Sequence, residues 1–474
     1  MTANSTPPGG PITALRRLSR RDHTRGSLLT SLFALALPMI ATSGLFLVFQ
    51  VVDLAFIAQL GDAPMASVII VNQVLRQIVM MMIMGLSFGS QALIARAVGE
   101  GRVDRAEHLA GQVVFLGAVF SAAVATIGLS VPGFLFSLAG ADPSFDVYGI
   151  PYLRLVYAFT FGMAGMQLFA AILGGAGDTT TPFLVITLQV AVGILAEWVL
   201  IFGHLGAPAL GVEGVALGIA LGNGIGMVVG MLVLFRGRSR VHIRRRHLRP
   251  DPAAIRTLLQ LSWPPAVQMG AQSIVVAIFL RLADDFGESV QTAYAIGLRL
   301  GMIVPMVCFP LAGACATLVG QALGSGNVPR AWQALRIGLQ VHCSIMWTLA
   351  LGLFFFRTQL MRLLSDDPTV VEIGAEYILY LSGAAFFWGF YFVFFRSLQG
   401  AGDMRVPMLI SVGSTFLVSL PLAFFLTQYT DVGRQGLWIA ILVSTAVTTL
   451  GTGARIASGQ WTHRPLATVG GSKP

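Results

Sequence analysis

The stretch Gly-Glu-Gly-Arg-Val-Asp-Arg-Ala at residues 99–106 returns later in the chain as Gly-Ser-Gly-Asn-Val-Pro-Arg-Ala at residues 324–331. The two stretches are 225 residues apart, and the same offset separates the Gly-Ala-Gly-Asp sequences at 175–178 and 400–403. Near the start of each half, Pro38 corresponds to Pro264 at an offset of 226. Because this spacing persists over a long stretch, we interpret the chain as two copies of one unit.

The composition indicates that lipid surrounds most of both copies. Of the 474 residues, 55% are hydrophobic and 11% are charged, whereas soluble proteins carry about 25% charged residues. This balance excludes a cytosolic enzyme, a disulfide-rich secreted module and a disordered regulator. A membrane-spanning helix needs about 20 apolar residues. The sequence predicts twelve such helices, over Leu28–Ala58 and residues 66–93, 109–133, 149–173, 183–203, 210–235, 255–283, 292–319, 333–356, 373–398, 407–428 and 436–457.

The two copies are expected to be parallel repeats, because an even number of helices, six, returns the chain to the same side of the membrane. The predicted fold is an all-α membrane protein with twelve transmembrane helices in two six-helix bundles. Two such bundles can rock against each other and give alternating access. The predicted parts are an N-terminal tail (1–26), an N-terminal bundle (27–235), a basic linker (236–254), a C-terminal bundle (255–457) and a C-terminal tail (458–474).

The basic residues predict the orientation of the chain. Most of the 30 Lys and Arg residues, Arg396 and Arg405 among them, fall in the two tails, the linker and alternate segments that we assign to one side of the membrane. The positive-inside rule then places both termini in the cytoplasm, and we expect a multi-pass protein of the bacterial inner membrane. The basic run at 242–247 is interpreted as a connector at the lipid surface and not as a nucleic-acid contact.

Two carboxylates, Asp53 and Glu197, lie well inside apolar runs. A charged group at this depth costs several kcal/mol and often marks an ion pathway. Such a group can take up a proton from one side and release it to the other, or it can bind Na⁺ if further oxygens complete the shell. We predict that both couple ion movement to transport; the alternative is that they only hydrogen-bond neighbouring helices.

Other polar and aromatic residues could complete this site. A supporting polar network is expected from Gln50, Asn72, Gln73 and Gln77, and Pro38 is the predicted hinge of the first helix. Soft and aromatic side chains can hold dissimilar organic ligands. The predicted substrate-cavity residues are Tyr157, Phe161, Met163, Gln272, Trp388 and Tyr391. Two embedded cations, Arg76 and Arg299, have no role assigned from the sequence.

Several familiar kinds of site are not indicated. The three cysteines, Cys308, Cys315 and Cys343, lack the spacing of metal ligands, so we expect no metal site and no disulfide framework. The Gly-Ala-Gly-Asp sequences lack the Lys-Ser/Thr of a phosphate-binding loop. They predict tight turns in which glycine adopts a positive φ.

In order and spacing, these motifs resemble the multidrug and toxic compound extrusion (MATE) family over residues 28–457. The segments that carry the resemblance are Val-Asp-Leu-Ala at 52–55, Asn72-Gln73, the two repeated loops of each half and residues 206–214. The resemblance implies export of organic, often cationic, compounds driven by protons or sodium ions.

Within that family, the Na⁺-coupled NorM-like branch has acids in helices seven and ten, where this chain has Gln272 and Trp388. The DinF-like branch has an acid late in helix five, where Glu197 falls. The chain therefore resembles the DinF-like pattern more closely, which implies ion chemistry in the N-terminal half.

From these observations we predict a monomeric, proton-coupled antiporter for small organic substrates, in contact with lipids and with no cofactor beyond the coupling ion. A sodium-coupled drug antiporter and a flippase for lipid-linked sugars are the alternatives. A membrane enzyme or a non-transporting receptor is less consistent with the scattered His residues and the paired repeats.

Overall fold

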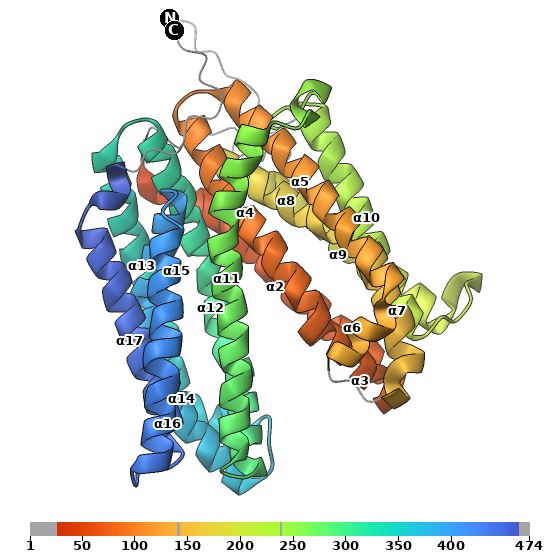
Figure 1. Ribbon diagram of the computed structural model, residues 1–474, viewed down its shortest axis with the longest axis vertical. Coiled ribbons are helices and arrows are strands. Elements are labelled where there is room, and N and C mark those ends of the chain that lie inside the picture. Colours follow the sequence, from red (N-terminus) through yellow and green to blue (C-terminus); the bar gives the residue numbers. More distant parts are fainter. Residues whose placement is uncertain (1–25, 140–142, 238, 464–474) are drawn as a thin grey trace, which may run out of the picture.

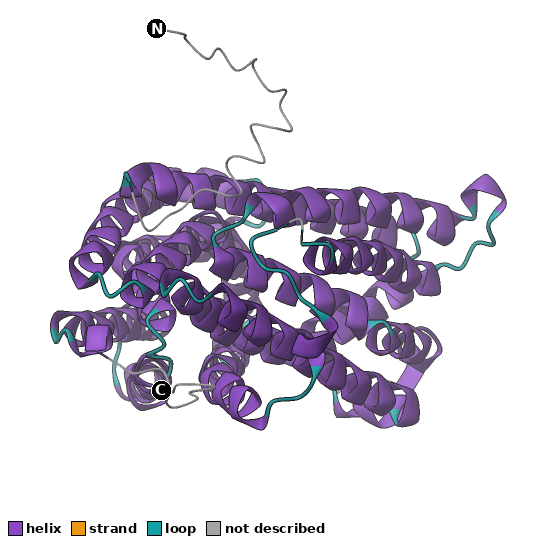
Figure 2. Cartoon of the chain, turned by 90° about the horizontal axis from the view of Figure 1, so that it is seen from above, coloured by secondary structure: helices purple, strands orange, loops and turns teal. Residues whose placement is uncertain are grey.

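The computed structural model describes residues 26–139, 143–237 and 239–463, so most of both predicted tails lies outside the described residues. All regular structure in these ranges is helical, as Figures 1 and 2 show. The first half contains α2 (Leu28–Ala58), α3 (Asp62–Ile70), the π-helix η1 (Val71–Leu75), α4 (Arg76–Gly99), α5 (Val103–Ser130), α6 (Pro132–Leu138), η2 (Pro143–Phe145), α7 (Asp146–Ala158), α8 (Thr160–Ala176), α9 (Thr180–Phe202), η3 (His204–Gly206) and α10 (Val212–Phe235).

The second half follows a connector that includes η4 (Arg245–Leu248). Its helices are α11 (Pro252–Asp284), α12 (Glu288–Gly324), α13 (Val328–Arg362), α14 (Pro368–Gly400), α15 (Arg405–Gly413), the π-helix η5 (Ser414–Ser419), α16 (Leu420–Tyr429), α17 (Gln435–Ala457) and η6 (Gln460–His463).

The predicted spans are confirmed in the described residues. Eleven helical segments are long and apolar enough to cross a membrane, and the pair α7 and α8, bent by 46°, supplies the twelfth. The two Gly-Ala-Gly-Asp turns also have the expected backbone, because Gly177 and Gly402 have φ values of 86° and 83°. We call the face with the start of α2, the connector and the end of α17 the terminal face, and the other the distal face.

The two halves meet near the terminal face and diverge toward the distal face (Figure 1). Close contacts between the halves join α4 to α12. A β-carbon on Gly99 would lie 2.2 Å from the carbonyl oxygen of Gln321, and one on Gly324 would lie 2.2 Å from that of Arg96. These two contacts are equivalent under the 225-residue offset, so the halves touch across a pseudo-two-fold axis.

The first helix of each half begins in the hydrophobic core of the other half. In α2, residues such as Leu28 and Leu32 are buried in a cluster with α12 and α13, whereas Ile57 belongs to a cluster of the first half. In α11, Leu258 is buried among α5, α8 and α10, whereas Phe279 belongs to a cluster of the second half. Both helices therefore belong to the two halves at once.

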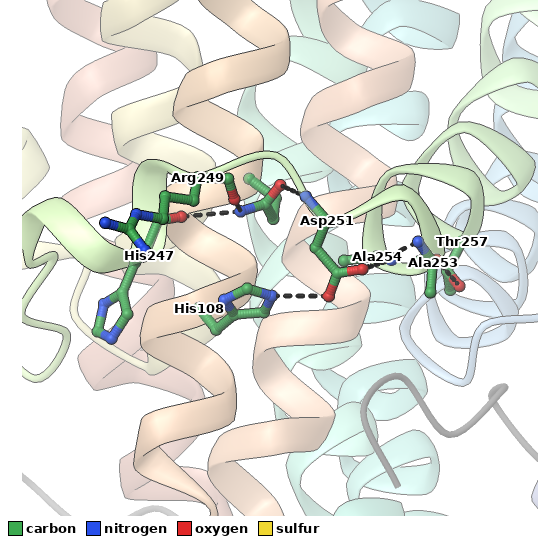
Figure 3. A network of polar contacts seen from close by, with 8 residues as sticks. His108, His247, Arg249, Asp251, Ala253, Ala254 and Thr257 are labelled. Atoms are coloured by element: carbon green, nitrogen blue, oxygen red, sulfur yellow. Dashed lines mark hydrogen bonds and ion pairs between the residues drawn. The ribbon is translucent and has the colours of Figure 1, made fainter.

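The connector between the halves is docked on α5 (Figure 3). The side chain of Gln112 donates to the carbonyls of His247 (2.8 Å) and Arg249 (2.7 Å), and its oxygen accepts from the amide of Asp251 (2.9 Å). The Asp251 carboxylate lies 2.9 Å from Nε2 of His108 and also caps α11 by accepting from the amide of Ala253 (2.9 Å). One carboxylate thus holds the start of the second half against the first.

Electrostatic surroundings act in different ways on two ionisable groups of this connector, His247 and Asp251. Burial lowers the pKa of His247, with a further contribution from the neighbouring Arg246. The hydrogen bond from His108 is the main cause that lowers the pKa of Asp251. Both shifts favour a neutral His247 and a charged Asp251 in the docked connector.

Candidate functional site

The two membrane-embedded acids lie on helices that face each other, Asp53 on α2 and Glu197 on α9. The ring of Phe49 is packed against Gly193, where an added β-carbon would lie 3.3 Å from the ring. At least about two turns further along each helix, the rings of Phe56 and Phe202 meet edge to face with centroids 5.7 Å apart. Positions four residues apart share a helix face, so these contacts place Asp53 and Glu197 at matching levels.

The buried carboxylate oxygens of both acids lack hydrogen-bond partners in the part of the chain that the structure describes. Glu197 is completely buried, and both of its carboxylate oxygens lack a hydrogen-bond partner among the described residues. Asp53 is half-buried, and its Oδ1 is likewise buried without a partner in the described ranges. Buried polar groups are nearly always hydrogen-bonded, so two such carboxyls on facing helices form an unusual site.

The space for Glu197 depends on a glycine of α10. A β-carbon on Gly218 would stand 2.5 Å from Cγ of Glu197 and 2.7 Å from its backbone nitrogen. Gly218 is one of five glycines spaced four residues apart on α10 that face α8 or α9, the others being Gly214, Gly222, Gly226 and Gly230. Such small-residue stripes let membrane helices approach closely.

A π-helical segment brings polar groups to the same place. Asn72 lies in η1, and its Oδ1 accepts from Nη1 of Arg76 (3.3 Å) and from the hydroxyl of Tyr152 (3.3 Å). Arg76 lies within electrostatic range of both Asp53 and Glu197. Single π-turns inside α-helices occur frequently at functional sites.

The predicted supporting residues are therefore only partly brought together. Asn72 lies in the network, whereas Gln50 and Gln73 are exposed and Gln77 is half-buried. Tyr152, which the sequence interpretation missed, is fully buried and joins the network through Asn72. A tyrosine in an apolar run is typical of the hydrophobic core. Only its hydroxyl, which needs a hydrogen-bond partner when buried, could have indicated a place in the polar network.

The comparisons with known proteins agree with this architecture. The family model MatE matches the chain twice, over residues 38–199 and 264–425, so that each match begins at one of the paired prolines. The chain belongs to the MATE family. Members of this family are transporters and not enzymes.

Relatives of this MATE protein carry different functional names. The probable multidrug resistance protein NorM of Thermotoga maritima is 27% identical over 438 residues, 92% of this chain and 94% of that protein. The FAD transporter of Shewanella oneidensis is 25% identical over 417 residues, 87% of this chain and 91% of that protein. A MATE family transporter solved in an outward-facing conformation is 21% identical, with a TM-score of 0.83, and the match covers 92% of this chain and 98% of that one.

The predicted substrate-cavity residues of this MATE protein lie on both halves. On α7 and α8, Tyr157 is buried with its hydroxyl donating to the carbonyl of Leu75 (3.1 Å), Phe161 is exposed and Met163 is half-buried. Tyr157 thus satisfies a carbonyl of the π-helix in this conformation. On α11 and α14, Gln272 is exposed, Trp388 is half-buried, and the Tyr391 hydroxyl accepts from Gln268 (2.9 Å).

Arg76 and Arg299, the two arginines with no role assigned from the sequence, lie in different surroundings. Arg76 belongs to the polar network of the first half, whereas Arg299 is exposed on α12. A role in a substrate cavity stays a prediction for the six residues above.

Proposed function

We propose that this protein is a proton-coupled antiporter that exports organic compounds across the bacterial inner membrane. The observation that carries the proposal is the pair Asp53, half-buried, and Glu197, fully buried, on facing helices, whose buried oxygens lack hydrogen-bond partners among the described residues. A charged carboxylate in such surroundings is costly unless a proton or a cation compensates it. The site therefore suits an ion that arrives and leaves during transport.

Arg76 gives the site a way to release the proton. Its charge lies within range of both carboxyl groups and favours their ionised form. A small movement of α2 relative to α4 changes the balance between this attraction and the cost of burial. Because α2 also reaches into the other half, proton binding on α2 acts on the contact between the halves.

The remaining features follow from the same proposal. The chain exports small organic compounds, cationic ones among them, as a monomer with no cofactor other than the coupling ion. Both termini and the connector lie in the cytoplasm, so the terminal face is the cytoplasmic face. The ion chemistry resides in the first half, in keeping with the DinF-like pattern.

The experiment uses proteoliposomes that contain the purified protein and a fluorescent organic cation. An imposed pH gradient should drive dye movement in the parent, and Asp53→Asn and Glu197→Gln should abolish that dependence. Asp62→Asn is the matched control, because Asp62 is an exposed acid at the start of α3. Full pH-driven transport by Asp53→Asn contradicts the proposal, and full transport from a sodium gradient at equal pH supports the sodium-coupled alternative.

A further inference from the structure

Arg396 is a buried cation between the two halves, although it was counted among the basic residues that predict the cytoplasmic side. It lies on α14, one turn before Gly400, and is 3% exposed. Its Nη1 donates to Oε1 of Gln399 (2.6 Å) and its Nη2 to Oε1 of Gln91 (2.6 Å). The guanidinium carbon lies 4.3 Å from the ring centroid of Phe88. The side chain is therefore enclosed by amides and aromatic rings.

The charge of Arg396 has no acidic partner in the described part of the chain. Its hydrogen bonds go to neutral amides, and its Nε is buried without a hydrogen-bond partner among the described residues. Asp403, the acid in the turn that follows α14, forms an ion pair with Arg455 instead (2.8 Å between Oδ2 and Nε). A buried charge without a counter-charge is costly, and cation–π contacts offset only part of that cost.

The bond from Arg396 crosses the interface between the halves. Gln91 belongs to α4 of the first half, and its Nε2 donates to the hydroxyl of Thr317 on α12 (3.1 Å). That hydroxyl in turn donates to the carbonyl of Gly174 on α8 (3.1 Å). These contacts lie near the closed terminal face, so separation of the halves there breaks the Arg396–Gln91 bond and frees the guanidinium.

The internal repeat shows that the architecture does not require this arginine. Gly175 and Gly400 occupy equivalent positions, and an added β-carbon would lie 2.7 Å from the carbonyl oxygen of Gln91 and 2.2 Å from that of Ala316, respectively. Gln91 and Ala316 are also 225 residues apart. The residue equivalent to Arg396 in the first half is Ala171. The same helix packing thus forms with alanine, and the arginine adds a charge that packing alone does not explain.

We propose that Arg396 recognises an anionic group, a carboxylate or a phosphate, on the organic cargo when the terminal face opens. This inference rests on the proposed transport function, because the halves must separate to expose the guanidinium. Arginine binds such groups through two parallel hydrogen bonds, and Nη1 and Nη2 are the atoms now held by the two glutamines. Cargo with an aromatic body and an anionic group fits Phe88 and Arg396 together.

The test compares two dyes that differ only at one group. Rhodamine 19 carries a free carboxylate, and rhodamine 6G is its ethyl ester. Binding of each dye to the purified full-length protein in lipid nanodiscs is followed by fluorescence anisotropy, without any ion gradient. The variants are Arg396→Gln and Arg396→Lys, with Arg336→Gln as the control because Arg336 is an exposed arginine on α13.

We expect Arg396→Gln to weaken rhodamine 19 binding by about tenfold or more, the effect of one charge-assisted hydrogen bond, and to leave rhodamine 6G nearly unchanged. Arg396→Lys should give an intermediate loss because it keeps the charge but not the paired geometry. Equal losses for both dyes, or rhodamine 19 binding equal to the parent, overturn the proposal. If Arg396→Gln does not fold, the comparison of the parent protein with Arg396→Lys tests the proposal instead. Tighter binding of rhodamine 6G than of rhodamine 19 by the parent protein would overturn the proposal.

Failure of the proposed function is recognised separately. If rhodamine 19 binding depends on Arg396 but neither dye moves under a pH gradient in proteoliposomes, proton-coupled transport is wrong and the anion site stands. If pH-driven transport depends on Asp53 but the two dyes respond alike to Arg396→Gln, the transport function stands and the anion site is wrong.

Discussion

Pro38 and Pro264 mark equivalent points on the two helices that cross between the halves. Before Pro38, α2 is buried in the core of the second half, and before Pro264, α11 is buried in the core of the first half. After each proline, the helix packs in the core of its own half. The residues that enter the foreign cores correspond as well, since Leu28 and Leu32 are 226 residues before Ala254 and Leu258.

This relationship gives the predicted hinge a physical basis. A proline inside a helix removes one backbone hydrogen bond and weakens the helix at that point. When the halves rock, the part of α2 before Pro38 must move with the second half and the part that carries Asp53 with the first. We therefore expect bending at Pro38 to connect the proposed ion site to the relative position of the halves.

Pro38→Ala should raise the thermal stability and slow transport. Alanine restores the missing amide donor and stiffens α2, a change in helix stability of up to about 3 kcal/mol. Pro151→Ala is the control because Pro151 lies inside α7, within the first half alone. Stability is measured by thermal unfolding in detergent and transport in proteoliposomes. Parent-like transport rates in Pro38→Ala would show that bending at this proline is not needed.

Gly218→Ala should destabilise the protein by about 1–3 kcal/mol, the usual cost of overpacking. The new β-carbon would stand 2.5 Å from Cγ of Glu197, and this contact includes backbone atoms of α9 that cannot turn away. Gly224→Ala on the same helix is the matched control, because no atom of the described residues lies within 4 Å of its added β-carbon. It should leave the unfolding temperature unchanged or raise it, since alanine favours a helix. Equal effects of the two substitutions would contradict the close packing around Glu197.

The sequence was sufficient for the features that follow from hydropathy, spacing and backbone geometry. Apolar runs placed the spans, the 225-residue offset related the halves, and Gly177 and Gly402 were correctly assigned to turns. The crossing of α2 and α11 was not predictable, because a repeat shows which residues are equivalent but not which core they enter. The burial of Arg396 was not predictable, since the predicted span 373–398 contains this arginine but hydropathy cannot show which groups enclose its charge.

The candidate site was predictable to the same extent. Asp53 and Glu197 stand out as acids in apolar runs, so their helices could be named. Their matching levels on α2 and α9 depend on how Phe49 and Phe56 pack, which is a property of the tertiary structure. The π-helix that presents Asn72 to Tyr152 has no periodicity of its own in the sequence.

Acidification should weaken the contact between the connector and α5 through Asp251. The hydrogen bond from His108 lowers the pKa of Asp251 below its ordinary value of 3.8. Its contribution to stability is therefore complete above pH 3.8 and is lost as the pH falls through the lower folded pKa. Asp251→Asn keeps a helix cap but removes the charged acceptor of the hydrogen bond from His108, so it should cost about 0.5–1 kcal/mol and flatten the dependence of the unfolding temperature on pH at its acid end. Asp104→Asn is the control, because its carboxylate is 92% exposed and lies 3.8 Å from Arg246. An unchanged acid limb in Asp251→Asn would contradict this assignment.

Gly324→Ala should force the halves apart at the terminal face. The added β-carbon would lie 2.2 Å from the carbonyl oxygen of Arg96, and neither backbone can rotate to relieve this contact.

Spin labels on cysteines introduced at Arg102 and Ser325, two exposed loop positions, would report the separation, because the three native cysteines are buried. Electron spin resonance should show a population at longer distance in Gly324→Ala, and Gly99→Ala should have the same effect through the equivalent contact with Gln321. Gly352→Ala is the control, since its added β-carbon meets no atom within 4 Å. The parent distance distribution in both Gly324→Ala and Gly99→Ala would mean that these glycines do not set the closure of the terminal face.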